Sequence, residues 1–153
     1  MARLKMISKI LEQAAQLKTR DEKKAFLLQN NSKPLRNILK GAFDKTITFN
    51  LPKGEPPYRK DVPDYEQSNL YKLSPRFKYF NTGGVGEQMV AARREKMFID
   101  MLEALPQEEA ELVIAMKEKK LVGMYKGITK KLVNETWPTL IADGSVNSDS
   151  EEE

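Results

Sequence analysis

The 153-residue chain contains no cysteine and no histidine. Without cysteine it has no disulfide framework, thiolate nucleophile or iron–sulfur site, and without both residue types it cannot build a zinc finger. Serine–histidine and cysteine–histidine catalysis and a histidine general base are excluded as well. A carboxylate-bound magnesium or calcium ion stays compatible with the composition. No other proton-transfer or nucleophilic constellation is visible, so we expect a protein that is not an enzyme and uses no cofactor.

Long apolar runs are also missing. No window approaches the roughly 18–20 consecutive apolar residues that a membrane span needs. The opening residues, MARLKMISKILEQAAQ, are interrupted by charge every few positions, which argues against a secretory signal. These features predict a cytoplasmic protein that does not associate with membranes.

Charge is abundant but unevenly distributed along the chain. The net charge is +4, yet residues 1–45 carry +7, residues 46–86 carry +2, residues 87–141 are balanced and residues 142–153 carry −5. The final segment, ADGSVNSDSEEE, has one larger apolar residue, so we expect a disordered acidic tail. Such a tail could solubilise the protein, cover its basic face until a polyanion displaces it, or dock a partner.

Apolar residues at helical spacing predict three helices before residue 45. The first covers about residues 4–17, with one apolar stripe through Leu4, Ile7 and Leu17. A capping-box spacing, Thr19 with Glu22, starts the second helix. Ser32 and Pro34 suit the first turn of a third, and serine is a good N-cap.

Three more helices are predicted after residue 86. An amphipathic helix covers about residues 87–104, with Val90, Met97, Phe98, Met101, Leu102 and Leu105 on its buried face and Arg94 as the one interruption. Pro106 opens the next helix, whose first turn holds Glu108, Glu109 and Glu111, where acids suit the positive end of the helix dipole. Thr129 is the expected N-cap of the last helix.

The stretch between the two helical parts has a different pattern. Residues 46–51, TITFNL, alternate polar and apolar side chains, which predicts a short strand or extended segment that pairs weakly with residues 77–80 or with another chain. Residues 52–80 hold five prolines and six tyrosines or phenylalanines interleaved with bases. Prolines at this density predict a long crossover without regular structure, and such loops are commonly functional or disordered.

Two motifs resemble ligand sites. Residues 82–87, TGGVGE, place glycines before a helix, but Glu87 and Gln88 stand where a phosphate-binding loop needs Lys and Ser or Thr. Glu108 and Glu111 are three residues apart and could share a metal ion, whereas the first-turn preference for acids explains both without one. We therefore expect a turn and an ordinary helix start.

Two surfaces are candidates for binding. Tyrosines beside bases in the crossover suit a protein interface, where aromatic and basic anchors are common, and also suit stacking on single-stranded nucleic acid. The predicted partner-binding residues are Tyr58, Arg59, Lys60, Tyr65, Tyr71 and Lys72. The bases of the N-terminal helices could instead contact nucleic-acid phosphates. These are Arg3, Lys5, Lys9, Lys18, Arg20, Lys23, Lys24, Lys33, Arg36 and Lys40.

The runs REKMFIDMLEALPQEEAELVIAMKEKKL at 94–121 and YKGITKKLVNETWPTLI at 125–141, with KMISKILEQA and NNSKPLRNIL nearer the N-terminus, resemble a small uncharacterised protein family of tailed phages, chiefly those that infect cyanobacteria. The resemblance covers most of residues 1–141. That family has no assigned activity, so the resemblance implies a viral accessory protein in a bacterial cytoplasm and transfers no functional residue.

The sequence thus predicts a mainly α-helical protein: a compact bundle of about six short helices with one short strand or extended segment, a crossover rich in proline and aromatic residues, and a disordered acidic tail. Residues 1–141 form one domain with a basic helical part (1–45), an extended part (46–86) and a second helical part (87–141), followed by the tail at 142–153. The predicted function is non-enzymatic binding of a host or phage protein. Nucleic-acid binding is the alternative, and a virion structural or assembly role is the third.

Overall fold

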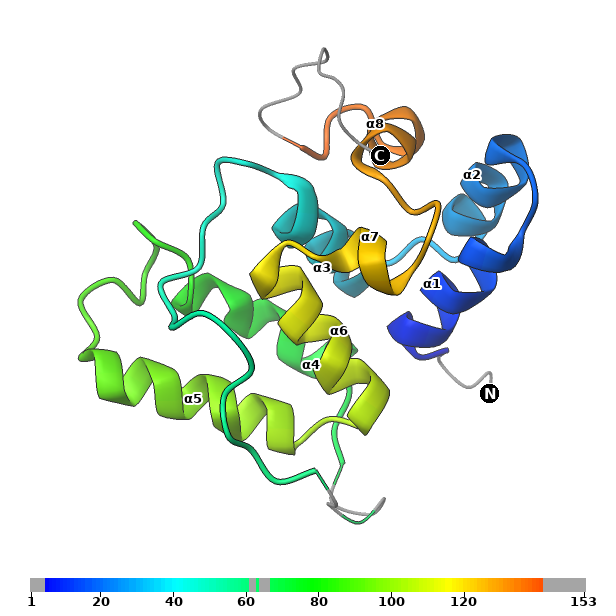
Figure 1. Ribbon diagram of the computed structural model, residues 1–153. Coiled ribbons are helices and arrows are strands. Elements are labelled where there is room, and N and C mark those ends of the chain that lie inside the picture. The colour runs from blue at the N-terminus through cyan, green and yellow to red at the C-terminus, as the bar shows by residue number, and fades with distance from the viewer. Residues whose placement is uncertain (1–4, 61–62, 64–66, 142–153) are drawn as a thin grey trace.

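The computed structural model describes residues 5–60, 63 and 67–141, and in these residues the chain is mainly helical, as predicted, and contains no sheet (Figure 1). Helix α6 lies in the middle and packs against α1, α3, α5 and α7. The elements of the described part are α1 (Ile7–Gln16), α2 (Arg20–Gln29), α3 (Lys33–Phe43), α4 (Leu70–Leu73), the 3-10 helix η2 (Ser74–Tyr79), α5 (Ala91–Glu103), α6 (Gln107–Glu118), α7 (Leu121–Met124) and α8 (Lys130–Thr136).

Three helix starts with a capping side chain, those of α2, α3 and α8, were predicted correctly. Thr19 and Glu22 form the capping box of α2. Ser32 accepts a hydrogen bond from the backbone N–H of Leu35 at the start of α3, and Thr129 does the same for Leu132 at α8. These caps depend only on residues three apart in the sequence, so local patterns suffice to find them.

The prediction for the start of α5 was wrong. The helix begins at Ala91 rather than at residue 87, and Val90, expected on the buried face, is 72% exposed. Residues 82–89 form turns instead, closed by hydrogen bonds from Glu87 N to Gly84 O and from Met89 N to Gly86 O. Gly86 passes close to η2, since a Cβ there would lie 2.0 Å from Tyr79 O. The turns thus fold residues 82–89 back against the end of η2, and α5 begins only after them.

The crossover at 52–80 contains more structure than its prolines suggested. Asn69 caps α4 by accepting the N–H of Lys72, and η2 follows with Pro75 in its first turn, where a missing N–H costs nothing. Phe77 and Phe80 are buried. The predicted strand at 46–51 is extended but forms one isolated antiparallel bridge, between Phe49 and Asn81, just beyond the expected partner at 77–80. The short helix α7 was not predicted.

The core is apolar and continuous across both helical parts. Phe98, Met101, Leu102 and Leu105 are buried as predicted, and Phe98 packs edge-to-face on Phe80 with ring centroids 5.3 Å apart. Among the described residues, no helix is both long and apolar enough to cross a membrane.

Candidate functional site: a lysine pocket between α3 and η2

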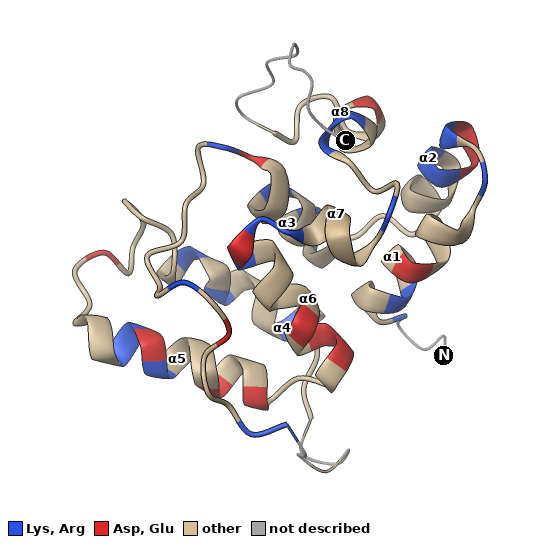
Figure 2. Cartoon of the chain, viewed as in Figure 1, with Lys and Arg blue, Asp and Glu red and all other residues tan. Residues whose placement is uncertain are grey.

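Three neighbouring elements carry charge of one sign only. Helices α3 and α4 and the 3-10 helix η2 contain six Lys or Arg residues and no Asp or Glu. The helices α1, α2, α5, α6 and α8 each mix both signs. Because α3 packs on both α4 and η2, bases that lie about 40 residues apart in the sequence share one surface (Figure 2).

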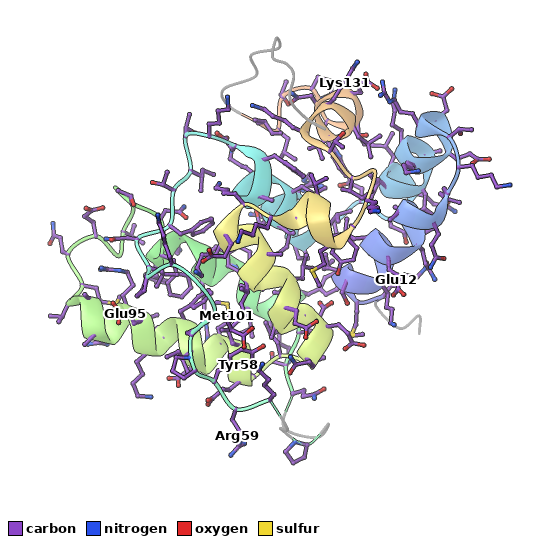
Figure 3. The ribbon with its side chains drawn as sticks, viewed as in Figure 1. Glu12, Tyr58, Arg59, Glu95, Met101 and Lys131 are labelled. Carbon is purple, nitrogen blue, oxygen red and sulfur yellow. The ribbon has the colours of Figure 1, made fainter. Side chains whose placement is uncertain are left out.

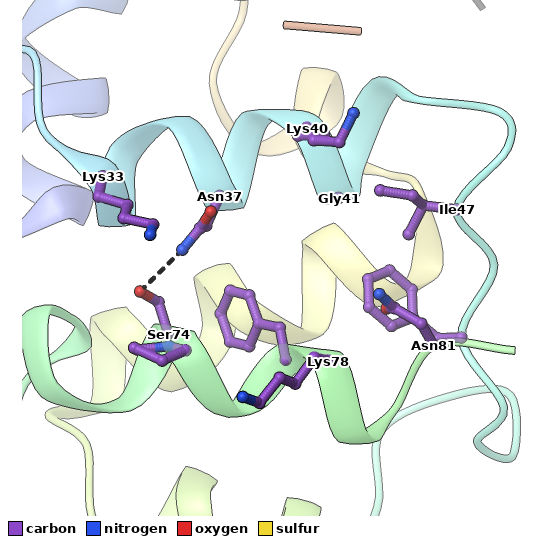
Figure 4. A pocket seen from close by; sticks show the side chains of 11 residues that line it. Lys33, Asn37, Lys40, Gly41, Ile47, Ser74, Lys78 and Asn81 are labelled. Atoms are coloured by element: carbon purple, nitrogen blue, oxygen red, sulfur yellow. Dashed lines mark hydrogen bonds between the residues drawn. The ribbon is translucent and has the colours of Figure 1, made fainter. Parts of the chain in front are cut away.

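A pocket of about 330 Å³ lies between α3 and η2 (Figure 4). We call it the lysine pocket, because Lys33 and Lys40 reach it from α3 and Lys78 from η2. None of the described residues that line it is acidic. The remaining lining residues are Asn37, Gly41, Ile47, Phe49, Ser74, Pro75, Phe77 and Asn81.

Two of the three lysines are available to a ligand. Lys33 and Lys78 form no ion pair with any residue in the described part of the chain; Lys78 Nζ lies 5.5 Å from the centroid of the Tyr79 ring. Lys40 Nζ is engaged, because it donates to Asp44 Oδ2 and to Leu140 O at 2.8 Å each. Asn37 Nδ2 donates to Ser74 Oγ at 3.2 Å and so joins the two walls (Figure 4).

The floor of the pocket depends on a close approach of α3 to α6. A Cβ on Gly41 would lie 2.7 Å from Met116 Sδ and 3.2 Å from Phe49 Cζ, so glycine leaves room for both side chains. The Phe49 ring lies against the core, and Lys119 Nζ sits 5.4 Å from its centroid. The resulting floor is apolar and aromatic beneath cationic walls.

Lys119 fixes the backbone that continues from α3. It ends α6 in the left-handed conformation, with φ 61°, and its Nζ donates to the carbonyls of Gly41, Asp44 (3.3 Å) and Ile47 (2.7 Å). These carbonyls lie at and beyond the C-terminus of α3, the negative end of its dipole. Part of the side chain reaches solvent, but desolvation of the ammonium among these groups lowers the pKa of Lys119.

Arg94, which interrupts the apolar pattern of α5, is a buried cation of this region. It is 6% exposed, with Nε donating to Asn50 O at 2.8 Å and Nη1 to Met89 O at 2.9 Å. Lys117, also buried, donates to Pro52 O at 3.0 Å and Gly54 O at 3.1 Å. Buried carbonyls need partners. Arg94, Lys117 and Lys119 therefore supply to residues 41–54 and 86–89 part of the hydrogen bonding that a sheet would have given.

The ten predicted nucleic-acid-binding residues do not form one free face. Lys9 pairs with Glu12 and Glu108, and Arg20 and Lys24 both pair with Glu135 of α8. Several others have local partners: Lys5 bonds to Gln13 and lies over Phe26, Lys23 to Leu17 O, and Arg36 to Asn31. Arg3 lies outside the described residues. Lys18 is exposed, and Lys33 and Lys40 line the lysine pocket.

The predicted partner-binding residues are partly used within the chain. Tyr58 is half-buried, and its hydroxyl accepts a hydrogen bond from Gln107 Nε2 at 3.3 Å. Tyr71 donates its hydroxyl to Lys5 O at 2.8 Å. Partial burial raises the pKa of both phenols. Tyr65, one of the six, lies outside the described residues.

The remaining three lie at the surface. The backbone of Arg59 donates to Glu103 on α5 at 2.8 Å, on the segment labelled in Figure 3. Lys60 pairs with Glu55 at 2.7 Å and sits 5.3 Å from the Tyr58 ring centroid. Lys72 is exposed on α4, one of the three elements that carry bases and no acid. The crossover residues are thus not gathered into one binding site.

Glu109 has a role that its place in a first turn did not reveal. It is 2% exposed, and its Oε2 accepts the backbone N–H of Ser8 at 2.7 Å, in the first turn of α1. Helix α1 has no capping side chain and no acid of its own in that turn. Glu109 therefore provides, from α6, both the hydrogen-bond acceptor and the negative charge that the first turn of α1 lacks. Burial raises the pKa of Glu109, and this effect exceeds that of the hydrogen bonds from Ser8, which lower the pKa. In the described part of the chain, no three acidic residues are grouped so as to hold a metal ion.

The lysine pocket itself was missed by the sequence reasoning, although a signal for it exists. Residues 67–86 contain three bases and no acid, and residues 31–43 likewise contain three bases and no acid. The net charges of residues 1–45 and 46–86 do not reveal these two acid-free runs, because each range also contains acidic residues outside the run. That the two runs face each other is a tertiary property.

Comparison with known proteins assigns the chain to a family whose function is unknown. No curated protein matches the sequence. A family model described as "Family of unknown function (DUF6433)" matches residues 10–123, which is most of the chain and includes both walls of the lysine pocket. The chain therefore belongs to the DUF6433 family, a family of unknown function.

Proposed function

We propose that this protein binds nucleic acid through the acid-free surface of α3, α4 and η2, with the lysine pocket at its centre. The observation that carries the proposal is the convergence of Lys33 and Lys78, both without an ion-pair partner in the described structure, on a pocket without an acidic lining residue. Residues 1–141 carry a net charge of +9, which adds long-range attraction for a polyanion.

The chemistry of the pocket fits a phosphate. A lysine ammonium is a compact point charge that donates to phosphate oxygens, and the Asn37 amide and Ser74 hydroxyl lie between the two free lysines. Exposed Arg76 and Lys72 extend the basic surface along η2 and α4. Contacts of this kind bind backbone phosphates independently of base sequence and weaken as salt rises.

The surface differs from the one expected from sequence alone. The bases of α1 and α2 are largely engaged within the chain, in part with Glu12, Glu108 and Glu135, so the proposal drops α1 and α2, keeps α3 and adds α4 and η2. Binding of a host or phage protein through residues 58–72 becomes the second candidate. Exposed Val85 and Val90, on the turn before α5, offer apolar surface for a protein contact at the opposite end of α5 from Arg59, whose backbone bonds to Glu103. The link to tailed phages stays a prediction from resemblance.

The test is fluorescence anisotropy with labelled single- and double-stranded oligonucleotides over a range of salt concentrations. Lys33→Ala/Lys78→Ala should weaken binding by about tenfold at low salt and reduce the salt slope by about 2, because two phosphate contacts are removed. The matched control, Lys18→Ala/Lys131→Ala, removes the same charge from exposed positions outside the pocket. Its effect should stay within about threefold.

Two results would contradict the proposal. If neither oligonucleotide binds the wild type at low salt, the surface does not recognise nucleic acid. If both double variants weaken binding equally, net charge alone attracts the oligonucleotide and the lysine pocket is not the site.

A further inference from the structure

A second pocket, of about 350 Å³, lies on another part of the molecule, where α1 meets the start of α6 and the end of α7. We call it the glutamate pocket, because Glu12 reaches it from α1 and Glu108 and Glu111 from α6. Figure 2 shows acidic residues on the first turns of α6, beside α1. The other lining residues are Ser8, Ala15, Gln16, Met124, Tyr125 and Lys126.

Tyr125 distinguishes this pocket from an ordinary acidic surface. The residue is 7% exposed, and its hydroxyl has no hydrogen-bond partner among the residues that the structure describes. The hydroxyl is not among the fully buried groups that lack a partner, so it reaches the solvent of the pocket that Tyr125 lines. Desolvation, and then the charges of Glu109 and the pocket glutamates, raise the pKa of Tyr125. A ligand with an N–H donor would supply the missing partner at the mouth of the pocket.

We infer that the glutamate pocket binds an organic cation with N–H donors, an alkylammonium or guanidinium group. The carboxylates of Glu12, Glu108 and Glu111 attract the charge, and each oxygen pair can accept more hydrogen bonds than it receives. The Tyr125 oxygen accepts one N–H of the ligand. Ala15 and Met124 offer apolar surface to the aliphatic stem.

The chain already shows part of this recognition. Lys9 Nζ lies 3.4 Å from Glu12 and 3.9 Å from Glu108, so an ammonium fits between these two carboxylates at the rim. Glu111 receives one hydrogen bond, from Gln107 Nε2 at 2.9 Å, and forms no ion pair with a described residue. The described carboxylates are not grouped closely enough for a metal ion, and this spread favours an extended cation. The inference concerns a different site from the lysine pocket and does not depend on nucleic-acid binding.

The ligand chemistry has two sources, a free polyamine or a Lys or Arg side chain of a partner protein. The probes are therefore spermidine and an acetylated, amidated tri-arginine peptide, each titrated at constant ionic strength. The readout is the methyl NMR signal of Met124 in full-length protein labelled at methionine methyl groups, with Met97 on α5 as internal control. This readout separates pocket binding from attraction to the acidic segment at 142–153.

We expect a saturable shift of the Met124 signal and none of Met97. Tyr125→Phe removes only the hydroxyl and should weaken binding about 3- to 10-fold, the usual effect of one hydrogen bond. Glu111→Gln should weaken it by a similar factor, because it removes a charge from the pocket. The matched control, Glu95→Gln, removes a carboxylate from α5 and should change affinity by less than about twofold.

The tighter probe identifies the source, and either outcome supports the pocket. The inference is overturned if neither probe shifts Met124 saturably. It is also overturned if Glu95→Gln weakens binding as much as Tyr125→Phe and Glu111→Gln do, since that would indicate general charge attraction.

Discussion

The lysine pocket and the glutamate pocket have nearly the same volume, about 330 and 350 Å³, and opposite charge. Beside each lies a charged side chain of the same sign as the pocket lining: the partly exposed Lys119 beside the lysine pocket and the buried Glu109 beside the glutamate pocket. Backbone groups form hydrogen bonds with both charges, carbonyls with Lys119 and an N–H with Glu109. In addition, Lys40 of the lysine pocket pairs with the buried Asp44.

The two regions differ in how their backbone is held. Around the lysine pocket the chain is largely irregular, and Arg94, Lys117 and Lys119 donate to eight backbone carbonyls there. The glutamate pocket lies between regular helices, and Glu109 is needed only at the start of α1. Irregular backbone requires more side-chain partners because its polar groups have no repeating ladder.

The first prediction concerns how much apolar packing stabilises the region around the lysine pocket, relative to the hydrogen bonds from its cations. The variant Phe98→Ala measures the contribution of packing. Phe98 is 3% exposed and packs on Phe80, whose carbonyl accepts the N–H of Asn50. We expect chemical denaturation to show a loss of about 3–5 kcal/mol. Val90→Ala, at an exposed position, should stay within about 0.5 kcal/mol. A loss below about 1 kcal/mol for Phe98→Ala would show that the ring is not part of the core.

Arg94→Met tests the cationic contribution directly. Methionine keeps an apolar stem but leaves the carbonyls of Asn50, Gly86 and Met89 without their donor. We expect a loss of about 3 kcal/mol in the free energy of unfolding. The neighbouring Arg93→Met is the matched control and should have little effect, because Arg93 is exposed. Equal stability of the two variants would mean that Arg94 does not hold the irregular segments.

Glu109→Ala is the corresponding test for the glutamate pocket. It leaves the buried N–H of Ser8 without an acceptor and should cost about 1–3 kcal/mol. Because one cap is lost rather than several carbonyl contacts, we expect a smaller loss than for Arg94→Met. Glu111→Ala, exposed on the same helix, is the control. A larger loss for Glu109→Ala than for Arg94→Met would reverse the comparison.

The smallest expected effect concerns pH. Since burial raises the pKa of Glu109 above its usual 4.5, the folded state takes up the proton before the unfolded state does. The stability of the wild type relative to Glu109→Gln should therefore increase as pH falls from neutral and level off below about 4.5. Urea titrations of both proteins across this range measure the difference. A difference that stays constant with pH would show that the pKa of Glu109 is not raised.

Local sequence patterns predicted much of the helical fold. The caps at Thr19, Ser32 and Thr129 and the apolar face around Phe98 were recognisable because each depends on residues within one or two turns. The start of α5 and the helices at 70–79 were not, since a contact of Gly86 with η2 and burial of Leu70, Leu73 and Phe77 decide them.

The sequence by itself determined the helical class, the absence of cysteine and histidine chemistry, and the excess of bases in residues 1–86. Only the tertiary structure decided which bases are paired, which are buried and which face a pocket. Lys33 and Lys78 meet because α3 packs on η2, and Glu109 reaches Ser8 across 101 residues of chain. Charge pairing depends on distances of a few ångströms between side chains, and those distances are set by packing rather than by position along the chain.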